Sequence, residues 1–536
     1  MQLAGQPIII LKENVERTRG HEALRSNIMA AKAIAAAVRT TLGPRGMDKM
    51  LVSGTSDVVV TNDGATILHE LSIQHPGGKM VVEVAETQDD MVGDGTTTAV
   101  ILVGALMESA EQLITQGIHP TVIAEGYRMG MAKALDIVKD LAITVTPDDR
   151  KTLMQIADTA MTGKSIESVK GKVDTIVVDA VKAVAQESDG RIVCDEDDVS
   201  IKKHVGESMD EVELVRGVVI DKSRVEEQMP RLVKKAKIAL LSSPLEIVKT
   251  QVKSKIRITS PQQMEAFDFQ ERETLKNLVD TIVASGASVV ICQKGIADAV
   301  QYYLAKAGIL AVEDVAEKDM KFASRAVCGN IVSKPEDLTQ ADLGTAEQVE
   351  DVEDAELIKI SGCKNPMAVT ILLRGSTQVL IDELERAVYD GVRVVMDAME
   401  DGKFVVGGGA VETELLLKLR DYANSIGGRT QLAIEAFAIA FETIPRTLAE
   451  NSGFNAIDKL VDLKAAHSKG KKYMGLNVYT GTIEDMKKLG VFEPMRVKTQ
   501  AIMSATEAAT MLTRIDDMMV SSKGAPSAPG GAPPMG

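Results

Sequence analysis

The chain has 536 residues and a formal net charge of −16 at neutral pH. This length exceeds what one hydrophobic core usually supports, so we expect several domains. The acidic balance argues against nucleic acid or an anionic membrane as the main partner. Hydrophobic residues make up 45% of the chain but aromatic residues only 3%, so the cores must be aliphatic.

The cysteines and the N-terminus indicate a cellular compartment. The four cysteines lie far apart and form no CxxC pair, which predicts neither disulfides nor a zinc site. The first residues lack a basic segment before an apolar one, and no apolar run approaches the length that spans a bilayer. We therefore expect a soluble protein of the reducing cytoplasm.

The first quarter of the chain predicts mostly helices. An Ala-rich helix is expected over residues 21–42, and Gly43-Pro44 ends it. Lys49–Val52 and Asp57–Thr61 flank a Ser-Gly-Thr-Ser turn, which is typical of a β-hairpin. Apolar residues at helical spacing predict four further helices over residues 65–72, 79–91, 99–115 and 121–141.

The middle of the chain has an α/β character. Residues 201–257 are richer in β-branched residues and basic clusters, so a separate domain is expected there. Residues 287–292, 295–307 and 309–314 predict a strand, a helix and a strand, a βαβ unit on a mostly parallel sheet. One long amphipathic helix is expected over 377–399.

After Gly407-Gly408-Gly409 the sequence returns to Ala-rich helices through about residue 515. The two ends of the chain are therefore alike, which suggests a discontinuous domain with the α/β segment inserted into it. Residues 521–536 consist almost entirely of Gly, Pro, Ala and Ser and predict a flexible tail.

Gly93-Asp94-Gly95-Thr96-Thr97-Thr98 is the most informative segment, because it stands directly before an apolar helix. The N–H groups of a first helical turn and the helix dipole favour an anion. An aspartate there would repel a phosphate unless a hard cation such as Mg²⁺ lay between them. The alternative is a plain Gly-Asp-Gly turn that caps a helix.

Asn62-Asp63-Gly64-Ala65-Thr66 repeats this arrangement at the head of another helix. If the two turns converge, Asp94 would hold the metal and Asp63 would bind or polarise the attacking water. An Asx turn between strand and helix is the alternative for Asp63.

Two further glycine loops lie beside helices, at Thr41-Leu42-Gly43-Pro44 and Gly407–Gly409, and their backbone groups suit phosphate, ribose or base contacts. Chain reversal alone explains them equally well. Asp390 lies at the border of the apolar stripe of the helix over 377–399, where a raised pKa would suit a general base. Simple solvation is the alternative.

Several patterns argue against other nucleotide folds. Asp158–Ser165 copies the second half of a Walker loop, but Asp158 replaces the first glycine and a helix precedes it. We reject a P-loop fold, although Lys164 in its Gly-Lys-Ser loop remains able to sense a phosphate. Gly93-Asp94-Gly95 lacks the third glycine of a dinucleotide fingerprint, and the histidines form no metal pair.

Scarce aromatic residues gather at the start of a helix in Ser260–Glu271. Met264, Phe267 and Phe269 precede charged turns there. They predict either local packing or an exposed apolar tip for a partner or a lid.

Five ordered segments together resemble a group II chaperonin of the archaeal thermosome type, and the likeness runs from end to end. The segments that carry it are Thr41–Lys49, Val60–Ile67, Val92–Thr98, Gly407–Glu412 and Arg496–Ile502. The resemblance implies a multidomain α and α/β fold: a mostly helical equatorial ATPase domain, an α/β hinge domain and an α/β apical domain with a helical lid protrusion.

The resemblance also implies where these domains lie. The expected ranges are 1–148 and 403–520 for the equatorial domain, 149–216 and 368–402 for the intermediate hinge, 217–367 for the apical domain with a protrusion at about 245–277, and 521–536 for the tail. Asp268-Phe269 departs from the usual apolar-then-acidic order at the tip of the protrusion.

Residue roles follow from the same resemblance. Asp94 is implied as the Mg²⁺ ligand, and Asp63 and Asp390 as the residues that position and activate water. The implied nucleotide contacts are Thr41, Leu42, Gly43, Gly95, Thr96, Thr97, Thr98, Lys164, Gly408, Asn477, Glu493 and Lys498. Asn477 stands where an aspartate is more usual, and Ser165-Ile166 is not the commonest continuation after Lys164.

The implied function is ATP-dependent enclosure of non-native proteins in a double ring of about eight or nine subunits per ring. The subunits are identical or paralogous, the lid is built in, and no separate co-chaperonin, nucleic acid or membrane is expected as a partner. Two alternatives stay open: a small-molecule kinase or ligase that uses the same Mg-ATP site, and a ring scaffold that binds nucleotide without hydrolysing it.

Overall fold

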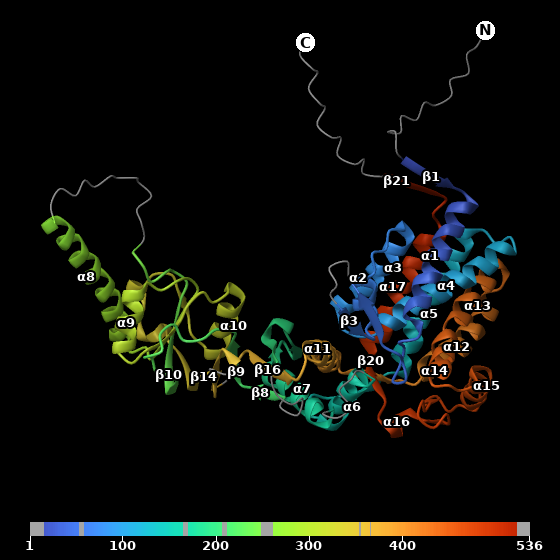
Figure 1. The fold of residues 1–536 in the computed structure, drawn as a ribbon. Coiled ribbons are helices and arrows are strands. Elements are labelled where there is room, and N and C mark those ends of the chain that lie inside the picture. The colour runs from blue at the N-terminus through green and yellow to red at the C-terminus, as the bar shows by residue number, and fades with distance from the viewer. Residues whose placement is uncertain are drawn as a thin grey trace, which may run out of the picture. The chain divides into compact units, whose positions relative to one another are not determined.

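A computed structural model describes residues 15–52, 58–163, 170–205, 212–247, 261–352, 355–364 and 366–521. The chain divides into two compact units, one formed by Met1–Thr144 with Lys403–Gly536 and the other by Val145–Gly402 (Figure 1). The first unit is therefore built from both ends of the chain. The expected six-part domain division is finer than this and stays a prediction.

The first unit is mostly helical. Its N-terminal half contains α1 (His21–Arg39), α2 (Gly64–Glu70), α3 (Pro76–Val92), α4 (Thr96–Thr115) and α5 (Pro120–Leu141). Its C-terminal half contains α12 (Ala410–Ile426), α13 (Gly428–Ala440), α14 (Thr443–Asn451), α15 (Ala456–His467), α16 (Met486–Leu489) and α17 (Met495–Thr513). The predicted helices of the first quarter are confirmed. Their starts shift by at most three residues, and the first helix begins at His21 as expected but ends at Arg39.

Short strands tie this unit together. The predicted hairpin is confirmed as β2 (Lys49–Val52) and β3 (Val58–Thr61). β1 (Val15–Arg19) pairs with β21 (Asp517–Ser521), and β17 (Lys403–Val406) pairs with both β4 (Ile143–Thr144) and β20 (Phe492–Pro494). β18 (Met474–Leu476) and β19 (Ile483–Asp485) form a second hairpin.

α4 runs through the core of this unit. Among the described residues it is the helix that is long and apolar enough to cross a membrane, and 67% of its apolar window is buried in the protein. Its uninterrupted apolar run stops before Glu108, and the helix forms part of the hydrophobic core. Val100, Val103 and Leu106 are fully buried, and burying one such side chain contributes about 1.5–3 kcal/mol.

The second unit contains two sheets with helices. β7 (Val199–Val205), β16 (Val369–Gly375) and β8 (Glu213–Val215) form a three-stranded sheet. It packs against α7 (Lys170–Val184) and α11 (Gln378–Asp401), and α6 (Arg150–Met161) packs on these two helices. The predicted long helix is thus confirmed, and Thr377 caps it. β5 (Gln186–Ser188) and β6 (Arg191–Val193) form a small hairpin.

The larger sheet has the strand order β12-β11-β10-β14-β15-β9, with β13 (Ile331–Val332) also on β10. The bounds are β9 (Gly217–Ile220), β10 (Leu232–Leu241), β11 (Val289–Cys292), β12 (Leu310–Val312), β14 (Gly344–Val352) and β15 (Leu357–Ser361). α9 (Asp298–Lys306) links the parallel strands β11 and β12, so the βαβ unit is confirmed. The expectation of a mostly parallel sheet is wrong, because β14, β15 and β9 join by antiparallel pairing.

Two further α-helices, α8 (Pro261–Ser285) and α10 (Glu317–Val327), also belong to this unit. The first half of α8 extends beyond the sheet (Figure 1).

Candidate functional site

The two Asp-Gly turns lie side by side in the first unit. Asp63 caps α2, since its Oδ2 accepts hydrogen bonds from Thr66 N and Thr66 Oγ1, both at 2.8 Å. Its other oxygen, Oδ1, accepts a hydrogen bond of 3.0 Å from Thr96 Oγ1. Because Thr96 is the first residue of α4, this carboxylate joins the N-termini of two helices.

Gly64 allows this close approach. A Cβ atom added at Gly64 would lie 2.7 Å from Thr97 Oγ1 and 2.9 Å from Thr97 N. Any larger residue would therefore push the start of α2 away from the start of α4.

The Asp94 turn depends on glycine backbone angles. Gly93 has a φ of 76° and Gly95 a φ of 81°, values at which other residues are strained. Asp94 Oδ1 accepts a hydrogen bond of 2.7 Å from Gly95 N. Gln88 Nε2 donates to Asp94 O at 2.8 Å and to Val497 O at 3.2 Å, which fastens the turn to the start of α17.

This arrangement presents the groups that bind a phosphate with a hard cation. The first-turn N–H groups of α4, at Thr96, Thr97 and Thr98, lie at the positive end of a 20-residue helix. Asp63 and Asp94 supply carboxylate oxygens beside them. No group of three or more His, Cys, Asp or Glu side chains forms a metal cage among the described residues. Mg²⁺ suits such a sparse donor set, because it takes its remaining ligands from phosphate and water.

A buried ionic triad lies next to the Asp94 turn. Lys498 Nζ is 2.7 Å from Glu412 Oε1 and 3.0 Å from Glu493 Oε2. Burial disfavours the charge on Lys498, but the two carboxylates outweigh it and raise its pKa above the usual value. The pKa of Glu493 is also raised, chiefly by burial. The charges of Glu412 and Asp94 raise it further, and the charge of Lys498 offsets part of this effect.

The glycine loop at Gly407-Gly408 meets this triad on one side and β18 on the other. A Cβ atom at Gly407 would lie 2.8 Å from Glu493 Oε1. Gly408 O accepts a hydrogen bond of 2.9 Å from Leu476 N, and Asn477 follows directly. Asn477 Oδ1 accepts from Tyr479 N at 3.0 Å, so its side chain caps the β18–β19 turn.

The Thr41–Gly43 loop reaches β18 through an apolar cluster. Thr41 is buried and donates to Val38 O at 2.8 Å, and Leu42 O accepts from Asn451 Nδ2 at 2.9 Å. Leu42 packs with Leu448 and Leu476 in one small apolar cluster. The site residues that the sequence predicts in the first unit therefore form one connected set.

Comparisons with known proteins identify the family. The sequence model of a family described as "TCP-1/cpn60 chaperonin family" matches residues 34–523 of the chain. The chain belongs to the TCP-1/cpn60 chaperonin family.

Individual relatives place this chaperonin in the group II branch. It is 54% identical to thermosome subunit beta of Archaeoglobus fulgidus, over 99% of this chain and 97% of the relative. It is also 54% identical to a thermosome subunit of Methanopyrus kandleri, over 96% of this chain and 95% of the relative. A solved open-state monomer of a group II chaperonin from Methanococcoides burtonii is 43% identical, with a TM-score of 0.59, and covers 79% of this chain and 100% of its own. The chain therefore has the multidomain group II fold and is a molecular chaperone.

The remaining predicted site residues of the chaperonin belong to the second unit. Asp390 on α11 is buried, with 6% of its surface exposed, rather than solvated. The next residue, Gly391, lies against α6, since a Cβ atom there would come within 2.9 Å of Met161 Sδ. Lys164 lies outside the described residues.

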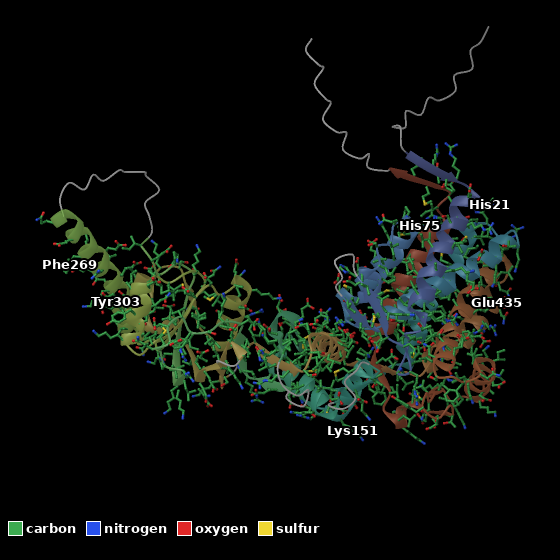
Figure 2. All side chains as sticks on the ribbon, in the orientation of Figure 1. His21, His75, Lys151, Phe269, Tyr303 and Glu435 are labelled. Atoms are coloured by element: carbon green, nitrogen blue, oxygen red, sulfur yellow. The ribbon has the colours of Figure 1, made fainter. Side chains whose placement is uncertain are left out.

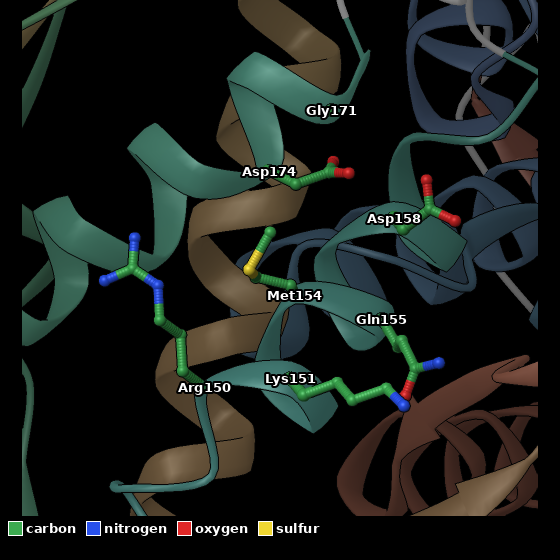
Figure 3. A pocket seen from close by; sticks show the side chains of 7 residues that line it. All are labelled: Arg150, Lys151, Met154, Gln155, Asp158, Gly171 and Asp174. Carbon is green, nitrogen blue, oxygen red and sulfur yellow. The ribbon is translucent and has the colours of Figure 1, made fainter.

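A pocket of about 570 Å³ lies between α6 and α7 in this unit. Figure 3 shows Asp158 on one helix and Asp174 on the other, with Lys151 near the start of α6. The helix that the sequence predicted before the Gly-Lys-Ser segment is therefore confirmed as α6.

Of the three predicted tip residues, Phe269 is described on the outer part of α8 (Figure 2). Its side chain is 70% exposed, which agrees with an exposed apolar tip. The side chains of Met264 and Phe267 lie outside the described residues.

Sequence reasoning missed Gln88 and Glu412. Gln88 falls on the buried stripe of α3 with Val81, Val84 and Val92, and a polar residue on such a stripe is the signal that could have found it. Glu412 belongs to the glycine-loop segment but received no role. Its Oε2 is buried with no hydrogen-bond partner among the described residues.

Proposed function

We propose that this chaperonin hydrolyses ATP at the site of the first unit and uses hydrolysis to close non-native proteins inside a chamber. The observation that carries the proposal is the Thr96–Asp63 hydrogen bond, which brings both acidic turns to one helix N-terminus. If the Gly93–Gly95 turn only capped α4, the Asp63 carboxylate would not be needed at the same helix N-terminus.

The residues present fit Mg²⁺ and a polyphosphate. Asp94 would hold the cation, and Gly95 with Thr96, Thr97 and Thr98 would bind phosphate oxygens through N–H and hydroxyl groups. The bound cation supplies charge neutralisation between the carboxylates and the phosphates. Asp63 would orient the attacking water by accepting its hydrogen bond, while Thr96 holds the carboxylate in place.

The base and ribose are assigned to the opposite side of the same set. Gly43 and Gly408 expose backbone at close range, and the Glu412–Lys498–Glu493 triad presents Glu493 as a half-buried acceptor. Asn477 already caps its own turn, so we assign it to shaping the β18–β19 hairpin beside the nucleotide.

Asp390 would complete the catalytic set as the second carboxylate that activates water. It belongs to the unit that also carries the apical segment, so its arrival would couple the chemistry to closure. Its buried position on α11 gives it a fixed orientation on a rigid element.

For the assembly, we propose two stacked rings of about eight or nine subunits, with a built-in lid and no separate co-chaperonin. Archaeoglobus fulgidus has relatives named thermosome subunit alpha and beta, at 52% and 54% identity to this chain, which supports rings that include paralogous subunits. Phe269 and its neighbours on α8 would serve lid or client contacts. We propose a cytoplasmic location.

The decisive experiment measures phosphate release by the assembled protein with Mg-ATP, with EDTA, and with the variant Asp94→Ala. Turnover should vanish on chelation and return with Mg²⁺ in the wild type but not in the variant. Negative-stain images with and without ATP should show double rings that change shape. Monomers, rings that ignore nucleotide, or turnover insensitive to EDTA would contradict the proposal. Phosphorylation or adenylation of an added metabolite would favour the kinase or ligase alternative.

A further inference from the structure

His467 is a buried histidine to which the sequence assigned no role. It is the last residue of α15, and its side chain is 0% exposed. Nδ1 lies 2.7 Å from Glu414 Oε1, and Nε2 lies 2.7 Å from the carbonyl oxygen of Met474. Both ring nitrogens therefore face an oxygen acceptor.

A neutral imidazole carries one N–H group and cannot donate to both oxygens, whereas an imidazolium donates to both. The hydrogen bond from His467 is the main cause that lowers the pKa of Glu414, and Lys418 acts in the same direction against burial, which favours an ionised carboxylate here. The C-terminal end of a helix also favours a cation at this position. With Glu414 ionised, both hydrogen bonds can form only when the ring carries two N–H groups, as the imidazolium ion does.

The Met474 carbonyl connects His467 to the nucleotide site. Met474 begins β18, and two residues later Leu476 N donates to Gly408 O at 2.9 Å. Between them, Gly475 packs so closely on the glycine loop that a Cβ atom would lie 2.9 Å from Gly408 O and 3.1 Å from Gly407 O. A shift of β18 would therefore move the backbone that lines the nucleotide.

We propose that His467, as an imidazolium ion, is a positioning residue that holds β18 against the Gly407–Gly408 loop and thereby sets nucleotide affinity. The inference deepens the proposed function and rests on it, because it assumes that this loop lines the ATP site. When the ring loses its proton to solvent, it must release the Met474 carbonyl or leave a bare nitrogen facing the Glu414 carboxylate. Either outcome loosens β18.

The other charged groups around His467 are already paired. Lys418 on α12 is 3.4 Å from Glu414 Oε2, and Lys464 on α15 is 2.9 Å from Glu442 on α14. Other charged groups on these elements also have partners: Arg446 pairs with Glu442, Glu484 accepts from Thr480 and Thr482, and Asp485 caps α16. Of these side chains, it is the His467 ring that hydrogen-bonds the backbone of β18, at Met474 O.

Glu414→Gln provides a matched control. A glutamine amide at this position can donate to the bare Nδ1 of a neutral ring, whose Nε2–H then still donates to Met474 O. This variant keeps both hydrogen bonds without the extra proton. His467→Phe removes both.

The test measures kcat and KM for Mg-ATP on assembled protein across neutral pH, from about pH 6 to about pH 9. In the wild type KM should rise about two- to tenfold with pH, as expected for the loss of one buried hydrogen bond. In Glu414→Gln, KM should stay at the low wild-type value at every pH. In His467→Phe, KM should be high at every pH. In both variants kcat should depend on pH as it does in the wild type. A wild-type KM that ignores pH, or a Glu414→Gln profile that follows the wild type, would overturn the inference.

Hydrogen exchange of the 474–476 segment, compared between variants at each pH, gives a readout that needs no nucleotide. Protection should fall with rising pH in the wild type but not in Glu414→Gln, and equal protection in both would overturn the inference. If this pattern appeared in a protein without ATPase activity, the β18 contact would stand and the proposed function would fall.

Discussion

Thr96 Oγ1 donates a hydrogen bond of 3.0 Å to Asp63 Oδ1, so the first residue of α4 holds the carboxylate that caps α2. The same carboxylate thus has a structural role, in capping, and a proposed chemical role, in orienting water. These two roles can be separated by experiment, because asparagine caps helices about as well as aspartate.

Asp63→Asn should keep the fold and lose the chemistry. The amide oxygen can still cap α2, so the melting temperature should stay near that of the wild type. ATP turnover should fall by about 10²- to 10⁴-fold, the usual effect of removing a group that acts on the reacting water. Phosphate release and thermal melting check both outcomes, and wild-type turnover would contradict the assigned role.

Asp390→Ala should largely abolish hydrolysis while it spares ATP binding, because this residue is proposed to act on water and not on the nucleotide. The measurements are phosphate release and equilibrium binding of Mg-ATP. Asp382→Asn is the matched control, since Asp382 lies on the same helix but is half-exposed and paired with Lys203 at 2.7 Å. Retained turnover in Asp390→Ala would remove Asp390 from the mechanism.

Gly64→Ala tests the close contact between the starts of α2 and α4. The added methyl group would meet the Thr97 backbone, so the two turns must separate by a few tenths of an ångström. We expect kcat/KM for ATP to fall about tenfold or more, because small misplacements of catalytic groups are costly. Gly171→Ala on α7 has no atom within 4 Å of its new methyl group and should leave turnover unchanged. Equal activity of the two variants would argue against a tightly packed site.

Lys498→Met should destabilise the first unit strongly, because it leaves the buried Glu412 and the half-buried Glu493 without their cation. Breaking such a buried pair costs about 3–5 kcal/mol. The raised pKa of Lys498 means that its stabilising effect is present at neutral pH and is lost only at strongly alkaline pH, as the pH passes the folded-state value. Thermal melting checks the loss, and adding Glu412→Gln should recover part of it. An unchanged melting temperature would show that the triad contributes little.

Glu442 should contribute to acid sensitivity. Burial pulls its pKa upward, but the hydrogen bonds and charges of Lys464 and Arg446 outweigh it, so the pKa lies below the usual value. Its stabilising effect is therefore present above the ordinary carboxyl range and is lost as pH falls through the lowered value. Glu442→Gln should lower stability by about 1 kcal/mol at pH 7 and by less at pH 3, as seen by melting. Glu450→Gln, in an exposed pair with Arg39, should show no such difference.

The sequence predicted those parts of the structure that depend on local pattern. The hairpin of β2 and β3, the helices α3 to α5 and the cap at Asp63 follow from spacing, turns and capping residues. The sheet of the second unit was predicted only in part, because β14 and β15 lie more than 100 residues from β10 in sequence. Their pairing direction depends on long-range packing that alternation of side chains does not encode.

The same limit applies to the site. Asp63 and Asp94 carry local signals, since each stands in a glycine turn before a helix. Glu412 and His467 do not, because their partners Lys498 and Met474 come from other elements and only the folded chain brings them together. Asp390 was placed at the border of an apolar stripe, and its burial follows from the packing of α11 on α6 and α7.

The pairing of β1 with β21 has a consequence for how the protein is made. Ala501, Ile502 and Leu512 of α17 belong to the same core as α1 and α4. The core of the first unit is therefore incomplete until nearly the whole chain has left the ribosome. The second unit is continuous in sequence and can fold while synthesis proceeds. During translation, therefore, the apolar faces of the N-terminal helices stay uncovered until the C-terminal helices arrive. The nascent chain of this chaperonin itself then exposes apolar surface that needs protection from aggregation.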